Sequence, residues 1–179
     1  MAQLQPIPLQ GAYIIDMPAF DDARGSFIKT FHATTLAQHG IDFQLKESYF
    51  SISNKNVVRG MHFQTPPHQH AKIVFCPQGA ILDVIVDLRK ASPTYGQHFA
   101  TELSAANHKA YYIPEGFAHG FKALTEGAIT YYLVSSEYSQ QHDTGIRYDS
   151  IGYDWQLPAP IISTRDLSFP TLQDFDSPF

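Results

Sequence analysis

Four histidines of this 179-residue chain fall in or beside segments with the pattern of β-strands. They are His62, His68, His70 and His119. An imidazole titrates near neutral pH, so it can take up or return a proton, and its neutral form also binds metal ions. The pattern therefore indicates either acid–base chemistry or a metal site.

His62 lies in the segment 57–64, whose alternating side chains predict a strand. On a regular strand Gly60, His62 and Gln64 share one face, and Arg59 lies on the opposite face. A polar set that faces the inside of a barrel is unusual for a pure core. We therefore interpret His62 as an active-site residue, with a structural or surface histidine as the alternative.

His68 and His70 are two residues apart, so on a strand their rings share a face, as two ligands of one metal ion must. The segment 114–119, Pro-Glu-Gly-Phe-Ala-His, resembles the second metal-binding motif of metal-dependent cupins. The first motif of those proteins also supplies a glutamate, whereas apolar residues such as Val74 follow His70 here. A three-histidine site of His68, His70 and His119, in an oxygenase or a metal-dependent isomerase, remains an alternative interpretation.

The elements that must position these residues are mostly short strands. The segment 81–88 alternates strictly, with Asp83 and Asp87 on one face and apolar residues on the other. A short helix is predicted over 33–39 and a helical turn after Ser163. Many short strands separated by turns predict a β-sandwich or barrel. The other predicted strands are 11–15, 26–31, 47–53, 57–64, 72–77, 98–103, 109–113, 120–123 and 128–135.

Length, charge and apolar content exclude several classes of protein. A chain of 179 residues fits one domain that covers 1–179. A formal net charge of −5 without a basic run argues against nucleic-acid binding. No apolar run approaches the length of a membrane span, and the first residues lack the features of a signal peptide. The single cysteine, Cys76, cannot form an intrachain disulfide. We expect a cytoplasmic protein with no membrane partner.

Six blocks of the sequence occur in the order and spacing of one known family. They are RGSF at 24–27, NVVRGMHFQ at 56–64, AKIV at 71–74, DVIVDLR at 83–89, SPTYG at 92–96 and IPEGFAHGF at 113–121. Together they make the chain similar to the dTDP-4-dehydrorhamnose 3,5-epimerase family from about Gly11 to Asp166.

The resemblance implies a fold, an assembly and a reaction. The fold is an all-β cupin, a double-stranded β-helix or jelly-roll barrel with one or two short helices, and the assembly is a homodimer. The reaction inverts C3, C5 or both beside the C4 ketone of a nucleotide-diphosphate 4-keto-6-deoxyhexose, with no metal or other cofactor. A proton next to a ketone is weakly acidic, so such an enzyme needs a base, a group that stabilises the enolate, and an acid on the opposite face.

The resemblance also implies roles for individual residues. His62 is the base and Asp166, near the C-terminus, is its partner, because a carboxylate on one imidazole nitrogen fixes the tautomer. Tyr132 is the acid, six residues before Tyr138, whereas the adjacent Tyr131 points to the other face of the strand. Lys72 is the remaining catalytic candidate, because its positive charge can stabilise the enolate oxygen. His119 is counted among the substrate-binding residues and is expected to assist Lys72. Its pairing with Asp83 is our own hypothesis.

The substrate-binding residues come from the same resemblance. Arg24 and Arg59 match contacts to the pyrophosphate, which suits the planar guanidinium. The aromatic residues expected to flank the nucleotide's base are Phe27 and Tyr138.

Two positions depart from the family at the place that reads the base. Lys29 stands where the family has glutamate, and Glu47-Ser48-Tyr49 replaces the family's Gln-x-Asn. A lysine donor and a glutamate acceptor suit cytosine better than thymine, and an unmatched buried polar group costs about 1–3 kcal/mol. We therefore hypothesise a CDP-linked substrate. The alternative is that Lys29 and Glu47 pair with each other and that the substrate is dTDP-linked.

Two further interpretations remain open from the sequence. A 3,4-ketoisomerase of related fold would use the same enolisation but move the carbonyl group. A non-catalytic module that binds a sugar nucleotide would need neither His62 nor Tyr132. The presence of both residues, together with Asp166, favours an epimerase.

Overall fold

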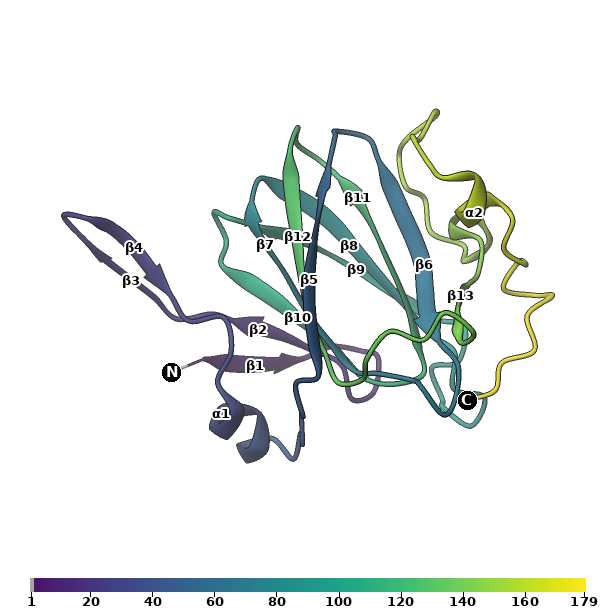
Figure 1. Cartoon of the computed structure of the whole chain (residues 1–179), viewed down its shortest axis with the longest axis horizontal. Helices are drawn as coiled ribbons and strands as arrows, with labels where there is room; N and C mark the ends of the chain where they lie inside the picture. The colour runs from purple at the N-terminus through teal and green to yellow at the C-terminus, as the bar shows by residue number, and fades with distance from the viewer. Residues whose placement is uncertain (1) are drawn as a thin grey trace.

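The computed structural model describes residues 2–179 and has two antiparallel sheets that face each other in a jelly-roll barrel (Figure 1). The six-stranded sheet has the order β1 (Gln3–Pro6), β2 (Tyr13–Asp16), β10 (Lys109–Ile113), β7 (Lys72–Gln78), β12 (Ala128–Val134) and β5 (Glu47–Ser53). The five-stranded sheet has the order β13 (Asp143–Gly145), β6 (Val58–Gln64), β11 (Phe117–Ala123), β8 (Ala80–Asp87) and β9 (His98–Ser104). The predicted all-β cupin-type fold is confirmed.

A separate hairpin of β3 (Ala19–Asp22) and β4 (Gly25–Ile28) extends away from the barrel (Figure 1). The sequence predicted one strand over 26–31. The observed strand β4 ends earlier, at Ile28, and its partner β3 was not predicted. β1 and β13 were also missed, because each is short and lies at a sheet edge.

The two predicted helical segments are present. Helix α1 (Ala33–Gln38) begins after His32, whose imidazole Nδ1 accepts a hydrogen bond from the Thr35 amide. Helix α2 (Thr164–Leu167) begins after Ser163, whose hydroxyl accepts a hydrogen bond from the amide of Asp166 at 3.1 Å. This cap places Asp166, a predicted site residue, at the first turn of α2. Of the helices in residues 2–179, none is long and apolar enough to cross a membrane.

The core lies on both faces of the five-stranded sheet. Ile81 and Ile85 of β8 pack inward with Phe121 against the six-stranded sheet. Val84 and Val86 face outward and are covered by the C-terminal part of the chain. The predicted alternation of β8 is therefore present, and both faces of the strand are buried. The outer cover consists of Ile146, Tyr148, Ile151, Tyr153, Trp155, Leu157, Ile162, Leu172, Phe175 and Phe179.

A β-bulge interrupts β6 just before His62. In the pairing of β6 with β11, His62 lies opposite His119 and Arg59 lies opposite Phe121, so two residues of β6 face one residue of β11. The backbones approach closely there, since a Cβ on Gly60 would stand 2.5 Å from the Gly120 Cα. Gly60 also has a φ of +143°, a conformation that residues with side chains rarely adopt. The extra residue reverses the alternation on which the sequence prediction relied.

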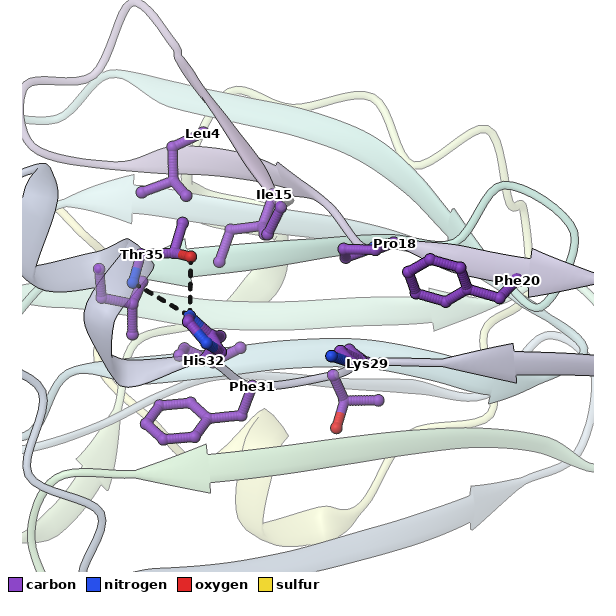
Figure 2. Close-up of a pocket in the computed structure, with 12 residues that line it drawn as sticks. Leu4, Ile15, Pro18, Phe20, Lys29, Phe31, His32 and Thr35 are labelled. Carbon is purple, nitrogen blue, oxygen red and sulfur yellow. Dashed lines mark hydrogen bonds between the residues drawn. The ribbon is translucent and has the colours of Figure 1, made fainter.

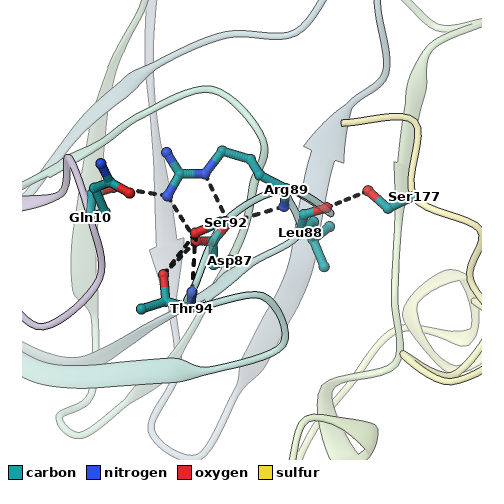
Figure 3. Close-up of polar contacts among 7 residues, drawn as sticks. All are labelled: Gln10, Asp87, Leu88, Arg89, Ser92, Thr94 and Ser177. Carbon is teal, nitrogen blue, oxygen red and sulfur yellow. Dashed lines mark hydrogen bonds and ion pairs between the residues drawn. The ribbon is translucent and has the colours of Figure 1, made fainter.

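The end of β8 is tied to the surrounding loops by one buried carboxylate (Figure 3). Asp87 accepts hydrogen bonds from the Arg89 guanidinium at 2.7 and 2.9 Å, from Ser92 at 2.6 Å and from Thr94 at 2.7 Å. Arg89 also donates to the Gln10 carbonyl at 2.8 Å. Burial opposes ionisation of Asp87, but these donors outweigh it and lower its pKa. Asp87, Arg89, Ser92 and Thr94, from the blocks at 83–89 and 92–96, thus form a structural anchor and do not line the cavity.

Candidate active site

A cavity of about 360 Å³ lies inside the barrel, with walls from both sheets. The six-stranded sheet contributes residues of β5, β7 and β12, and the five-stranded sheet contributes residues of β6 and β13. Most of its lining is polar or aromatic, as expected for a binding site. The lining residues are Glu47, Tyr49, Ser51, Arg59, His62, Phe63, Gln64, His70, Lys72, Tyr132, Val134, Ser136, Tyr138, Asp143 and Arg165.

His62 and Asp166 form a hydrogen-bonded pair at this cavity. The Nε2 atom of His62 is 2.9 Å from the Oδ1 atom of Asp166, and the other carboxylate oxygen accepts from the Gly60 amide at 3.1 Å. Burial opposes ionisation of Asp166, but the contacts with His62 and Gly60 outweigh it and lower its pKa. An ionised Asp166 keeps the hydrogen on Nε2, so Nδ1 retains the lone pair that can accept a proton. The predicted contact of His62 with Asp166 is present.

Lys72 is buried beside His62, although it carries an ammonium group. Its Nζ donates to the His62 carbonyl at 3.3 Å. Burial lowers the Lys72 pKa to about 8, an effect that the carboxylates of Asp143 and Asp83 partly offset. A buried cation with one hydrogen bond can bind an oxygen that becomes negative during a reaction.

His119 lies directly opposite His62 in the β6–β11 pairing and is fully enclosed. Its Nε2 is 2.8 Å from the Oδ2 atom of Asp83, so the predicted partner is in contact. Burial lowers the pKa of His119, so its ring is neutral at neutral pH. The ring edge of His119 meets Tyr132, with a centroid distance of 5.8 Å. His119 therefore supports the wall behind Tyr132 and does not itself line the cavity.

Tyr132 is on β12, on the wall opposite His62, and is nearly buried. Burial raises its pKa well above the ordinary value for tyrosine, so the phenol keeps its proton and can act as an acid. Tyr131 faces the other side of the sheet, where its ring stacks on Phe75 at 5.1 Å. The predicted separation of these two tyrosines is correct.

Arg59, Glu47 and Tyr138 lie around the open end of the cavity. The sequence prediction placed Arg59 on the face away from His62. That prediction is wrong, because the bulge at Gly60 turns both side chains to one side. Arg59 donates to the Ser53 hydroxyl at 3.1 Å, and Glu47 accepts from the Tyr138 amide at 2.8 Å.

Besides His119, three predicted binding residues lie outside the cavity of their own chain. Arg24 pairs with Asp22 at the tip of the β3–β4 hairpin, where its side chain is 91% exposed. Phe27, on the same hairpin, is 63% exposed. Lys29 lines a separate, mostly apolar pocket of about 150 Å³ near α1 (Figure 2). Its ammonium lies 6.0 Å from the centroid of the Phe20 ring. Lys29 and Glu47 therefore do not pair within the chain.

The three histidines of the metal alternative do not converge. The ring of His68 packs against that of His142, with centroids 4.5 Å apart, and His119 is hydrogen-bonded to Asp83. His70 directs Nδ1 toward Gln64, and burial lowers its pKa to about 3. Within residues 2–179, no three His, Cys, Asp or Glu side chains are grouped so that they could hold one metal ion. The alternative three-histidine site is therefore not formed in the described residues.

Two aromatic residues at the site were given no contact with the catalytic residues by the sequence analysis, although Tyr49 was noted there as a departure from the family. Tyr49 stacks on Tyr132, and Phe169 packs edge-on against His62 with a centroid distance of 5.9 Å. The signal for Tyr49 was its position in a strand that pairs with the strand of Tyr132. Phe169 follows α2 in an irregular segment, so no periodicity could indicate its contact.

The comparison with known proteins decides between the remaining interpretations. Residues 6–174 match the family model described as dTDP-4-dehydrorhamnose 3,5-epimerase. The chain belongs to this family. It is thus an enzyme of the isomerase class with a cupin-type fold, and the interpretations as a ketoisomerase or a non-catalytic module are not supported.

Individual relatives span nearly the whole chain. The dTDP-4-dehydrorhamnose 3,5-epimerase of Methanothermobacter thermautotrophicus is 39% identical and covers 93% of this chain and 92% of its own length. The dTDP-4-dehydrorhamnose 3-epimerase of Streptomyces niveus is 36% identical and covers 92% and 81%. The solved epimerase of Legionella pneumophila, in complex with dTDP-4-keto-L-rhamnose, has a TM-score of 0.94 at 31% identity and covers 98% and 95%.

Proposed function

We propose that this epimerase acts on a nucleotide-diphosphate 4-keto-6-deoxyhexose, which it inverts at C3, C5 or both without a metal or other cofactor. The observation that carries the proposal is the placement of His62 and Tyr132 on opposite walls of one cavity, with Lys72 between the sheets. Inversion requires that a proton leaves one face of a carbon and returns to the other face. Two walls with a base on one and an acid on the other meet that requirement.

The proposed steps use only groups of the chain. His62, oriented by Asp166, takes the proton next to the C4 ketone at Nδ1. The electron pair of the broken C–H bond moves to the ketone oxygen, and the Lys72 ammonium stabilises the enolate that results. The enolate carbon then takes the phenol proton of Tyr132 on the opposite face, and solvent restores the proton of Tyr132. His62 returns its proton to solvent before the next cycle.

The nucleotide of the substrate is either dTDP or CDP, and each has its own support. The relatives named above act on or bind dTDP sugars by their names, which supports a dTDP substrate. The Glu47 carboxylate at the cavity opening is an acceptor that suits the amino group of cytosine, which supports CDP. A cytoplasmic location is also part of the proposal.

We propose a homodimer in which each hairpin reaches the cavity of the partner. The support is the β3–β4 hairpin, which extends away from the barrel with Phe27 and Arg24 exposed (Figure 1). A large apolar ring held away from its own core gains stability when a second subunit covers it. Light scattering should give twice the mass of one chain. A monomer mass at micromolar concentration would contradict the dimer.

The proposed function is tested by deuterium uptake. Metal-stripped protein is incubated in heavy water with dTDP- or CDP-4-keto-6-deoxyglucose, and uptake at C3 and C5 is followed by NMR. Uptake identifies enolisation, the inverted carbon and the preferred nucleotide in one measurement. No uptake with either substrate, followed by uptake after a divalent metal is added, would contradict the metal-free mechanism.

The low pKa of Lys72 predicts an alkaline limit of activity. The enolate needs the charged ammonium, which is lost as pH rises through about 8, so kcat should fall about tenfold per pH unit above that value. Lys72→Met removes the charge and should lower kcat about 100-fold and abolish this limb. The control is Lys55→Arg, at an exposed turn, which should keep the profile of the native protein. An unchanged limb in Lys72→Met would assign it to another group.

A further inference from the structure

Tyr49 is placed against the proposed acid by strand pairing. β5 and β12 are antiparallel neighbours, and Tyr49 lies directly opposite Tyr132 in their register. The two rings stack with centroids 4.8 Å apart and planes 24° from parallel. Stacking of this kind stabilises an aromatic pair beyond the burial of apolar area, so it favours one position of the Tyr132 ring.

The contacts of Tyr132 come from two directions. Tyr49 covers the ring face, and the edge of His119 meets it from the five-stranded sheet. His119 is itself fixed by Asp83 at 2.8 Å and is buried, so it does not move easily. Of the two residues that contact the Tyr132 ring, Tyr49 is therefore the one that can move more easily.

Tyr49 also lies on the solvent side of the acid. It is 40% exposed and lines the cavity, whereas Tyr132 is 8% exposed. Loss of the Tyr49 ring would open space beside Tyr132 and admit water to it. The opened space would let the phenol shift relative to the enolate carbon, and a displacement of about 1 Å can cost about 100-fold in rate.

We propose that Tyr49 is a positioning residue that holds Tyr132 for the return of the proton in the inversion step. The inference rests on the proposed function, and it concerns one step of it. Proton removal belongs to His62 on the other wall, so Tyr49 should act on the second half of the reaction alone.

The two halves of the reaction have separate readouts. After His62 removes the proton, the enolate either regains a solvent-derived proton from His62, which gives exchange without inversion, or takes one from Tyr132, which gives inversion. The ratio of inverted to exchanged product therefore measures the step of Tyr132. A general loss of folding or binding lowers both products and leaves the ratio unchanged.

The test compares this ratio, in heavy water, among the native protein, Tyr49→Leu and Tyr49→Phe. Tyr49→Leu should lower the ratio at least 10-fold, and Tyr49→Phe, which keeps the ring, should stay within about twofold of the native ratio. The control Phe50→Leu removes a ring that stacks on Tyr131 on the outer face of the same two strands, and it should keep the native ratio. If Tyr49→Leu does not fold, Tyr49→Met replaces it.

An unchanged ratio in Tyr49→Leu or Tyr49→Met would overturn the inference, even if both rates fall. A similar fall of the ratio in Phe50→Leu would also overturn it, because the cause would then be the pairing of β5 with β12. Failure of the proposed function gives a different result, namely no exchange in the native protein.

Discussion

Replacement of His62 by alanine is expected to lower deuterium uptake into the sugar about 1,000-fold, at C3 and C5 alike. General base catalysis by a positioned side chain contributes between about 100-fold and 10,000-fold to a proton transfer. His62 is the cavity residue that pairs with an ionised carboxylate through one nitrogen and keeps the other available. The measurement is NMR of the exchanged substrate over time.

The matched control for His62→Ala is His68→Ala. His68 is exposed near the end of β6, where its ring packs against His142, and it does not line the cavity. Its replacement should leave uptake within about twofold of the native rate. Full uptake in His62→Ala would remove His62 from the role of base. The same loss in both variants would indicate a general effect of histidine removal at this end of the barrel.

Asp166, the partner of His62, is held in place by contacts of its own. Asp166 is held at the start of α2 by the Ser163 cap, and it binds the Gly60 amide inside the bulge. The bulge thus receives a hydrogen bond acceptor from a segment about 100 residues away in sequence. The base, its orienting carboxylate and the irregular backbone between β6 and β11 form one connected unit.

Much of the fold could be predicted because alternation reports directly on strands that are buried on at least one face. β8 and β12 are examples, and the position of Tyr131 opposite to Tyr132 followed from the same period of two. The helical turn at α2 followed from the Ser163 cap. These features depend on local sequence, which a single chain contains.

Other features of the site depend on contacts between distant segments, which the local sequence pattern does not indicate. Arg59 was assigned to the wrong face, because a bulge adds one residue without any change in the apolar pattern. The binding roles of Arg24 and Phe27 stay predictions, because both residues lie on a hairpin outside their own barrel and would contact substrate only in the proposed dimer. The stacking of Tyr49 on Tyr132 depends on the register of β5 with β12. Pairing partners and registers are set by the whole fold.

Replacement of Tyr132 by phenylalanine is expected to separate proton exchange from inversion. The ring remains to stack on Tyr49 and to pack against His119, while the acidic hydrogen is lost. Inversion should fall about 1,000-fold, within the range for loss of a general acid, and exchange should keep at least one-tenth of the native rate. Exchange by NMR and formation of the inverted sugar are measured in the same sample.

The control for Tyr132→Phe is Tyr131→Phe, which removes the same hydroxyl from the next residue of β12. Tyr131 stacks on Phe75 outside the cavity, so both exchange and inversion should stay native. An equal loss of exchange and inversion in Tyr132→Phe would mean that the phenol acts before the enolate forms, for example by binding the ketone oxygen. Retained inversion would assign the acid to another group. The expected result, exchange without inversion, requires that base and acid are separate groups, because only then can one proton transfer continue after the other has stopped. Their places on β6 and β12, in the two facing sheets, meet this requirement.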